Sequence, residues 1–318
     1  MQYNRIVKEF ELSGIIPLVR IDDIRDALPL AGALTSAGFK VIEIVFRSNA
    51  AKDALKLIAS KCQNMLVGAG TITSVEQVDE AFEAGAQYIV TPSFNPKVVD
   101  RCMELDIPIF PGCSNATDIE QAYERKLRVV KFFPSELLGG VEMIKAFSRP
   151  YPSIRYIPTG GINSNNLNKY LSCREVLCCA GTFLVEEDLL KEGKFNEITK
   201  NVHKAINDML DIKLDHVAIN TNEQEGIKLL KTFSSLSGLN YNQGEYTVGG
   251  IEAVLENKVG ELGHIAFNSP NLERCIYYLS DRGFVVDENS IKKNEKGCIT
   301  KVNLKGDNAG FIIQLIKK

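Results

Sequence analysis

Short apolar runs alternate with helix-like patterns through the first 210 residues of the chain. The runs have the length of buried strands, and each is followed by apolar residues at helical spacing. Eight runs are predicted to be strands, at 15–20, 41–46, 65–71, 88–92, 107–112, 129–133, 155–161 and 176–181. Eight strand–helix units predict a parallel α/β sheet. Their number favours a closed (β/α)8 TIM barrel over an open doubly wound sheet.

The remainder of the chain is built around a short near-repeat. Leu-Asp-His-Val-Ala-Ile-Asn at 214–220 is echoed by Leu-Gly-His-Ile-Ala-Phe-Asn at 262–268. A helix-like pattern follows each copy, at 223–237 and 271–283. Further strand candidates lie at 250–255, 299–304 and 310–316. We therefore predict two domains, residues 1–210 and residues 211–318, the second a small α+β domain with an internal repeat.

Composition and charge narrow the classes of partner. The chain has 318 residues, of which 45% are hydrophobic and 24% charged, and its net charge is −3. That charge gives no support to nucleic-acid binding, and no apolar run approaches the length that spans a membrane. Eight scattered cysteines are interpreted as buried thiols, which predicts a cytoplasmic protein. We expect the partners to be small molecules.

Two charged residues interrupt predicted buried strands. Lys131 lies inside the run 129–133, and Glu43 lies inside the run 41–46. A lone buried charge is costly, and a desolvated lysine at a strand end is a nucleophile for carbonyl substrates. Taken singly, the lysine could extend to water and the glutamate could form a structural ion pair. Together, at the C-terminal strand ends where barrels carry their active sites, the two residues favour catalysis.

Other residues at the same rim are candidates for binding an anion. Arg20 closes the first predicted strand, where it would meet either a substrate anion or a surface carboxylate. Gly160, Gly161, Gly181 and Thr182 close the last two strands. Glycines there let backbone N–H groups approach phosphate oxygens closely, although a single Gly-Gly pair is more often only a turn.

Residues 1–210 resemble the bacterial 2-keto-3-deoxy-6-phosphogluconate (KDPG) aldolases, including those acting on the galactonate epimer. The matching segments are Glu43-Ile-Val-Phe-Arg47, Gly68-Ala-Gly-Thr71, Thr91-Pro92, Phe110-Pro-Gly112, Lys131-Phe-Phe-Pro-Ser-Glu-Leu-Leu-Gly-Gly140 and Pro158-Thr-Gly-Gly161. They occur in the family's order and cover the whole predicted barrel. Ser135 departs from the pattern, because alanine is common at its position.

The resemblance implies a role for each matched residue. It implies that Lys131 forms a Schiff base and that Glu43 is the acid and base. It places the keto-acid carboxylate on Arg47 and Thr71. The remaining implied contacts are a wall around the pyruvyl methyl group, formed by Pro92 and Phe133, and a phosphate site formed by Gly160, Gly161, Gly181 and Thr182.

The implied activity is that of a class I aldolase, a lyase that needs no metal cofactor. It would cleave KDPG or its galactonate epimer to pyruvate and glyceraldehyde 3-phosphate, with 4-hydroxy-2-oxoglutarate as an alternative substrate. The resemblance also suggests a homotrimer. An alternative hypothesis is an aldolase that has lost its activity and serves as an assembly or sensing scaffold. The buried charges argue against it, because burying them costs stability and a scaffold does not need them.

Residues 211–318 resemble the glyoxalase/vicinal-oxygen-chelate (VOC) superfamily, built from paired βαβββ modules. The matched histidines, His216 and His264, carry the resemblance. It implies a divalent metal held by His216, His264, Glu252 (or Glu256) and Gln314, a donor set that suits a transition metal. The alternatives are relic histidines packed in a sheet, or a ligand bound without metal. For the role of this module we consider three possibilities, which are regulation, ligand sensing, and a second enzyme in a bifunctional protein.

Overall fold

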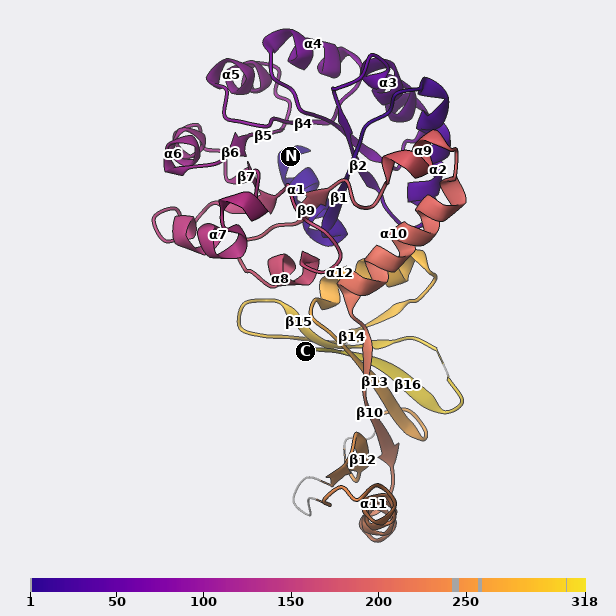
Figure 1. The fold of residues 1–318 in the computed structure, drawn as a ribbon. Helices are drawn as coiled ribbons and strands as arrows, with labels where there is room; N and C mark the ends of the chain where they lie inside the picture. The colour runs from indigo at the N-terminus through magenta and orange to yellow at the C-terminus, as the bar shows by residue number, and fades with distance from the viewer. Residues whose placement is uncertain (1, 242–245, 257–258, 307) are drawn as a thin grey trace. The chain divides into compact units, whose positions relative to one another are not determined.

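The computed structural model describes residues 2–241, 246–256, 259–306 and 308–318. The chain divides into two compact units, Met1–Met209 and Leu210–Lys318 (Figure 1).

Unit 1 contains nine short strands wrapped by helices (Figure 1). The strands are β1 Ile15–Val19, β2 Val41–Val45, β3 Leu66–Gly70, β4 Tyr88–Val90, β5 Ile109–Phe110, β6 Gly112–Cys113, β7 Val129–Phe132, β8 Arg155–Pro158 and β9 Cys179–Gly181. The α-helices are α1 Gln2–Ser13, α2 Ala27–Ser36, α3 Ala51–Lys61, α4 Val75–Glu83, α5 Pro96–Glu104, α6 Ala116–Glu124, α7 Gly140–Ser148, α8 Leu167–Leu171, α9 Glu187–Lys191 and α10 Phe195–Leu210. Two 3₁₀ turns, η1 Ile24–Asp26 and η2 Glu136–Leu138, precede α2 and α7.

The strands of unit 1 form a closed parallel ring. One sheet has the order β5-β4-β3-β2-β1-β9, and a second has the order β6-β7-β8. Isolated parallel bridges, Tyr156 to Val176 and Thr159 to Ala180, join β8 to the β9 side of the ring. The fold class predicted for this part, a TIM-like α/β fold with parallel strands, is therefore confirmed.

The fifth predicted strand, 107–112, is broken into β5 and β6. Pro111 lies between them and has no N–H to contribute to a ladder. Its carbonyl still accepts a hydrogen bond of 2.9 Å from Lys131 N. The break lets β5 pair with β4 while β6 pairs with β7, so this one segment connects the two sheets.

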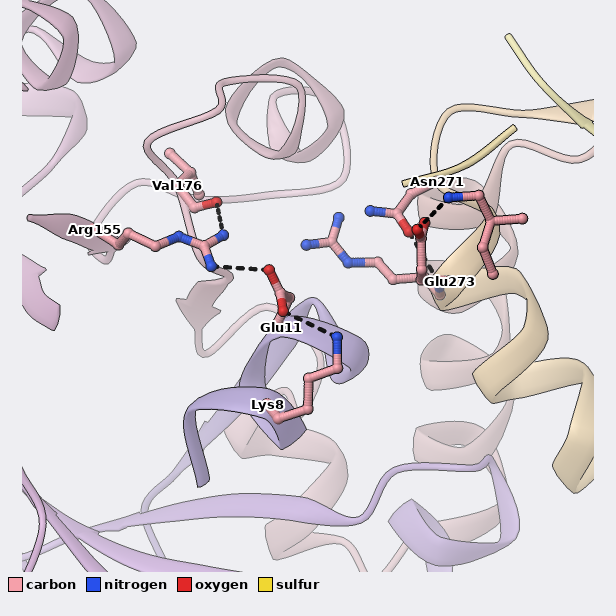
Figure 2. Close-up of polar contacts among 8 residues, drawn as sticks. Lys8, Glu11, Arg155, Val176, Asn271 and Glu273 are labelled. Atoms are coloured by element: carbon pink, nitrogen blue, oxygen red, sulfur yellow. Dashed lines mark hydrogen bonds and ion pairs between the residues drawn. The ribbon is translucent and has the colours of Figure 1, made fainter. Parts of the chain in front are cut away.

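Helix α1 closes the N-terminal end of the ring. Its Ile6 and Phe10 are fully buried in one cluster with inward-facing strand residues, and the Phe10 ring lies 4.9 Å from that of Tyr88. Figure 2 shows Glu11 of α1 bonded to Arg155, the first residue of β8, at 2.8 Å. Arg155 also donates to the Val176 carbonyl at 3.3 Å, across the seam that only isolated bridges join. The candidate active site is expected at the opposite end of the ring, where the strands have their C-terminal ends.

Local signals start several of these helices. Ser74 accepts a hydrogen bond from Gln77 N at the start of α4, and Asn115 accepts one from Asp118 N at the start of α6. Asn95 caps α5, in which Pro96 is the first helical residue. These are favoured N-cap and N1 residues, so the strand-to-helix turns follow from the local sequence.

In its described residues, unit 2 is a seven-stranded sheet with two helices. Its elements are β10 Lys213–Asn220, α11 Glu223–Ser237, β11 Thr247–Val248, β12 Ile251–Val254, β13 Gly263–Ser269, α12 Leu272–Asp281, β14 Val286–Lys293, β15 Ile299–Leu304 and β16 Phe311–Lys317. The strand order is β11-β12-β10-β13-β16-β15-β14, with β10 and β13 antiparallel at the centre. Glu273 of α12 accepts a hydrogen bond of 2.7 Å from Ile299 N, which fixes this helix to β15 (Figure 2).

The two halves of unit 2 match only in part. The second half is βαβββ, the module that the VOC resemblance implied, although its strand β14 was not among the strand candidates. The first half, within the described residues, is βαββ, one strand short of the prediction. Between α11 and β12 the described residues hold β11 alone, whereas residues 282–310 hold both β14 and β15.

Among the described residues, no helix is both long enough and apolar enough to cross a membrane.

Candidate active site

Lys131 and Glu43 meet at the centre of the barrel. Lys131 lies on β7 and Glu43 on β2, and their side chains are 5% and 1% exposed. The Lys131 Nζ atom lies 3.8 Å from Glu43 Oε1. Within the described chain, that carboxylate oxygen is buried and accepts no hydrogen bond. An unsatisfied buried acceptor costs stability, so the pair is better explained by chemistry than by folding.

The environment of Glu43 controls its proton. Burial raises the pKa of the Glu43 carboxyl above its ordinary value, while the positive charges of Lys131 and Arg47 oppose that rise. A carboxyl with a raised pKa exchanges protons more readily near neutral pH than an exposed one. Glu43 is therefore suited to act as both acid and base.

Strand glycines make room for these side chains. A Cβ added at Gly70 on β3 would lie 2.0 Å from Glu43 Oε1, so only glycine leaves space for the carboxylate. A Cβ at Gly112 would lie 2.4 Å from the backbone of Pro92. Sequence reasoning quoted both glycines but gave them no role. The available signal was that glycine inside a strand often marks close approach by another group.

Three predicted binding residues follow strand ends beside this pair. The Phe133 ring follows β7, with its centroid 5.4 Å from Lys131 Nζ. Pro92 follows β4 and is half-buried. Thr71 follows β3 and has a φ of 61°, in the left-handed region that β-branched residues seldom adopt. Such an outlier is typical of functional sites.

The two predicted arginines differ in their surroundings. Arg47 lies two residues beyond β2, is exposed, and its charge acts on Glu43. Arg20 follows β1, and its Nε donates to Asp22 at 2.9 Å. This is an ion pair with a surface carboxylate, and a contact of Arg20 with a substrate anion stays a prediction.

The predicted phosphate residues lie at the ends of β8 and β9. Gly160 and Gly161 follow β8 with φ of 91° and 82°, a conformation that favours glycine. Asn166 Nδ2 donates to the Gly161 carbonyl at 2.9 Å, which holds the turn. Gly181 ends β9, and Thr182 after it is exposed.

The predicted metal ligands of unit 2 come together only in part. His216 Nε2 lies 3.2 Å from His264 Nε2 and 3.5 Å from Glu252 Oε2. The amide nitrogen of Gln314 donates to Asn303 at 2.9 Å. In the part of the chain that the structure describes, no group of three or more His, Cys, Asp or Glu side chains could hold a metal ion.

The histidine pair is instead part of a hydrogen-bonded series. Asp215 accepts a bond of 2.7 Å from His216 Nδ1 and another of 2.7 Å from Asn268. A shift of register between Leu214 and His216 brings Asp215 to this position. His216 Nδ1 thus bonds to Asp215, and His216 Nε2 faces His264 Nε2, so both ring nitrogens of His216 have partners.

A parallel barrel with a buried lysine and carboxylate at its C-terminal end belongs to the class of enzymes that act on a carbonyl carbon. The sequence model of the "KDPG and KHG aldolase" family matches residues 6–201. The chain belongs to this family.

Relatives agree with this assignment. A "2-dehydro-3-deoxy-phosphogluconate aldolase" of Treponema pallidum is 44% identical over 194 residues, which cover 61% of this chain and 92% of the relative. A solved KDPG aldolase from Legionella pneumophila, with pyruvate captured as a covalent carbinolamine intermediate, is 32% identical with a TM-score of 0.61. It covers 63% of this chain and 97% of its own. The Zymomonas mobilis ZM4 enzyme with 3-phosphoglycerate is 31% identical with a TM-score of 0.60, covering 64% and 95%.

Proposed function

We propose that the barrel is a class I aldolase that cleaves a phosphorylated 2-keto-3-deoxy sugar acid through a Schiff base on Lys131. The observation that carries this proposal is the buried pair, with Lys131 Nζ 3.8 Å from Glu43 Oε1. The products would be pyruvate and glyceraldehyde 3-phosphate. KDPG is the expected substrate, and its galactonate epimer differs from it at one hydroxyl.

The residues of the pair supply the whole reaction. The neutral Lys131 amine attacks the C2 ketone, and Glu43 transfers the protons that allow water to leave. Glu43 then takes the C4 hydroxyl proton, the C3–C4 bond breaks, and its electrons move to the iminium nitrogen. The aldehyde leaves, the enamine is protonated at C3, and water hydrolyses the imine to release pyruvate. The iminium is the electron sink, so the lysine does the work of a Lewis acid.

Two relatives support this mechanism and the phosphate site. Pyruvate was captured covalently in the Legionella enzyme, as expected for an amine nucleophile. The Zymomonas structure holds 3-phosphoglycerate, a compound the size of the phosphorylated product. We assign Arg47 and Thr71 to the keto-acid carboxylate and Pro92 and Phe133 to the methyl group. We assign the phosphate to the glycines after β8, to the glycine that ends β9, and to Thr182.

A second substrate is compatible with the same centre. The family name includes the KHG aldolases, which take 4-hydroxy-2-oxoglutarate. This substrate shares the keto-acid end that Lys131 would attack but carries a carboxylate instead of a phosphate. Comparing kcat/KM for the two substrates would rank them, and we expect the phosphorylated one to be preferred.

Borohydride trapping tests the proposal directly. Pyruvate plus borohydride should add mass to one tryptic peptide, the one containing Lys131, and Lys131→Ala should abolish the adduct. Lys97→Ala, which removes an exposed lysine from α5, is the control and should trap normally. Labelling of another lysine would show that the nucleophile has been misassigned.

We further propose that residues 211–318 form a VOC-like domain. Three features support this: the repeated histidines, the β10 and β13 pair at the centre of the sheet, and the equivalent places of Glu252 and Gln314. Glu252 pairs with Ala218, two residues after His216, and Gln314 pairs with Ala266, two residues after His264. A separate metal-dependent activity or a sensor role for this domain stays a prediction.

Elemental analysis of the purified protein addresses the divalent metal. One metal per chain, lost in His264→Ala but kept in His203→Ala, would establish the site despite the poor fit of its donors. Metal-free protein would leave the cluster as a hydrogen-bonded series. The homotrimer and the cytoplasmic location also stay predictions, and light scattering would measure the first.

A further inference from the structure

A chain of hydrogen bonds runs beside the glycine turn that follows β8. Ser135 Oγ donates to the Tyr170 hydroxyl at 3.0 Å, and that hydroxyl donates to Glu136 Oε1. Ser135 and Tyr170 are fully buried, whereas Glu136 is exposed. Burial and the Glu136 carboxylate raise the pKa of Tyr170, so its hydroxyl stays protonated and remains a donor.

The same residues hold the glycine turn through their backbone. Ser135 N donates to the Thr159 carbonyl at 2.8 Å, and Glu136 N donates to the Gly160 carbonyl at 3.2 Å. A Cβ added at Gly161 would lie 2.6 Å from Glu136 Cβ and Cγ. The methylene groups of Glu136 therefore lie directly against the turn.

The carboxylate of Glu136 is directed toward Tyr170. A Cβ added at Gly140 would lie 2.8 Å from the Tyr170 hydroxyl and 3.3 Å from Glu136 Oε1, so Gly140 leaves room for their hydrogen bond. Glu136 thus places apolar methylenes on the glycine turn and keeps its charge beside a buried phenol.

We propose that Tyr170 is a positioning residue for the phosphate end of the site, holding the Glu136 carboxylate away from the Gly160–Gly161 turn. This rests on the proposed phosphate site. Without the hydroxyl, the exposed Glu136 side chain is free to rotate toward the turn. A like charge a few ångströms from a phosphate dianion is repulsive, so binding of a phosphorylated substrate weakens.

The test uses the full chain and variants that preserve the fold. Tyr170→Phe removes only the hydroxyl and keeps the buried ring. It should raise KM for the phosphorylated substrate roughly tenfold, the effect expected from losing one hydrogen bond to a charged group. kcat should stay within about twofold of wild type, because Tyr170 bonds to Ser135 and Glu136 and not to the Lys131–Glu43 pair. KM for 4-hydroxy-2-oxoglutarate should rise less than KM for the phosphorylated substrate, because its single carboxylate charge is repelled less than a phosphate dianion.

A second substitution separates charge from structure. Adding Glu136→Gln to Tyr170→Phe removes the repulsive charge and should restore most of the lost affinity. Ser135→Ala leaves the bond between Tyr170 and Glu136 in place, so it should have a smaller effect than Tyr170→Phe. Tyr156→Phe is the matched control, because it removes a buried phenol hydroxyl of β8 that lies outside this series.

Two further measurements keep this inference separate from the proposed function. Pyruvate carries no phosphate, so borohydride trapping with pyruvate reports on Lys131 alone and should be equal in all these variants. Calorimetric binding of inorganic phosphate needs no turnover, and it should weaken in Tyr170→Phe and recover in the double variant. If wild type fails to trap pyruvate, the proposed function fails, and phosphate binding still decides the role of Tyr170.

Several outcomes would overturn the inference. One is an unchanged KM and unchanged phosphate binding in Tyr170→Phe. Another is an equal rise in KM for both substrates, or slower trapping, which would mean that Tyr170 supports the lysine strand. A double variant no better than Tyr170→Phe would remove electrostatic repulsion as the cause. Substituting Gly161 itself is less informative, because any side chain there would collide with Glu136.

Discussion

At the scale of single residues, the proposed site depends on the contrast between a buried carboxylate, Glu43, and an exposed guanidinium, Arg47. Glu43 is 1% exposed, and burial raises the pKa of its carboxyl, against the charges of Lys131 and Arg47. Arg47 is exposed and lies beyond the end of β2. We therefore propose that Glu43 exchanges protons inside the barrel and that Arg47 binds a charged group at its rim. Their substitutions should separate in kinetics.

Glu43→Gln should lower kcat by about 10²–10⁴-fold and leave KM nearly unchanged, because Glu43 moves protons only as bonds change. Its pH profile is a further test. The base must be ionised, so wild-type kcat should fall as the pH drops through a pKa above the ordinary value of 4.5. The variant should lack this acid limb. Glu142→Gln on α7 is the exposed control, and a normal kcat in Glu43→Gln would refute the assigned role.

Arg47→Ala should mainly raise KM, because a grip on the substrate carboxylate exists in both ground and transition states. Loss of such a charged pair costs about 2–4 kcal/mol, roughly 30- to 1000-fold in kcat/KM. Arg25→Ala, which removes another exposed arginine near the same rim, is the comparison. Steady-state kinetics decide the matter. A loss of kcat at constant KM would mean that Arg47 acts on the chemical step instead.

At the scale of elements, alternation of strands and helices was enough to predict the barrel and its catalytic end. The burial of β1, β2 and β3 at every position explains why their sequences read as continuous apolar runs. The break between β5 and β6 falls at Pro111. It was not predicted, because the residues on both sides of Pro111 form one apolar run. Strand β14, Val-Asp-Glu-Asn-Ser-Ile-Lys-Lys, was not predicted, because its polar residues lack strand periodicity.

The site was predictable where it depends on strand direction. Lys131 and Glu43 meet because parallel strands carry their C-terminal ends to one edge, which the sequence reveals. The sequence offered a surface carboxylate as one partner of Arg20 but did not identify Asp22, and the series from Ser135 through Tyr170 to Glu136 was not predicted. Both depend on side-chain rotamers, and Ser135 and Tyr170 lie 35 residues apart in the chain.

Substituting Gly70 tests whether the Glu43 carboxylate needs the space that β3 leaves for it. Gly70→Ala places a methyl group where a Cβ lies 2.0 Å from Glu43 Oε1, so the carboxylate must move. We expect kcat to fall at least tenfold, since ångström-scale misplacement of a catalytic group costs this much or more.

Gly32→Ala on α2 is the matched control, because nothing lies within 4 Å of its Cβ position. It should leave kcat unchanged and stabilise the helix by about 0.5–1 kcal/mol. Urea unfolding and kinetics of the two variants measure both effects. Equal activity in Gly70→Ala and wild type would show that Glu43 tolerates displacement.

At the scale of the whole molecule, each unit has a hydrophobic core of its own. The barrel core joins α1 to the strands, and a smaller cluster in unit 2 contains Leu230, Val248 and Ala253. Helix α10 belongs to the barrel, because Thr199 donates to the Ala33 carbonyl and Asp208 accepts from Asn168. The match to the Treponema aldolase takes in 92% of that protein yet 61% of this chain. Unit 2 is therefore an addition to a barrel that relatives use without it.

A chain truncated to residues 1–210 should consequently fold and trap pyruvate at a rate within about twofold of the full chain, as independent domains allow. A matched truncation to residues 1–200 removes Val202, Ile206 and Met209, which α10 buries. It should lose several kcal/mol of stability, at about 1.5–3 kcal/mol for each buried side chain. Thermal unfolding and trapping rates measure both. If the 1–210 chain folds but traps pyruvate more than tenfold slower, unit 2 takes part in the aldolase reaction. An equal rate would restrict unit 2 to a separate activity or to binding.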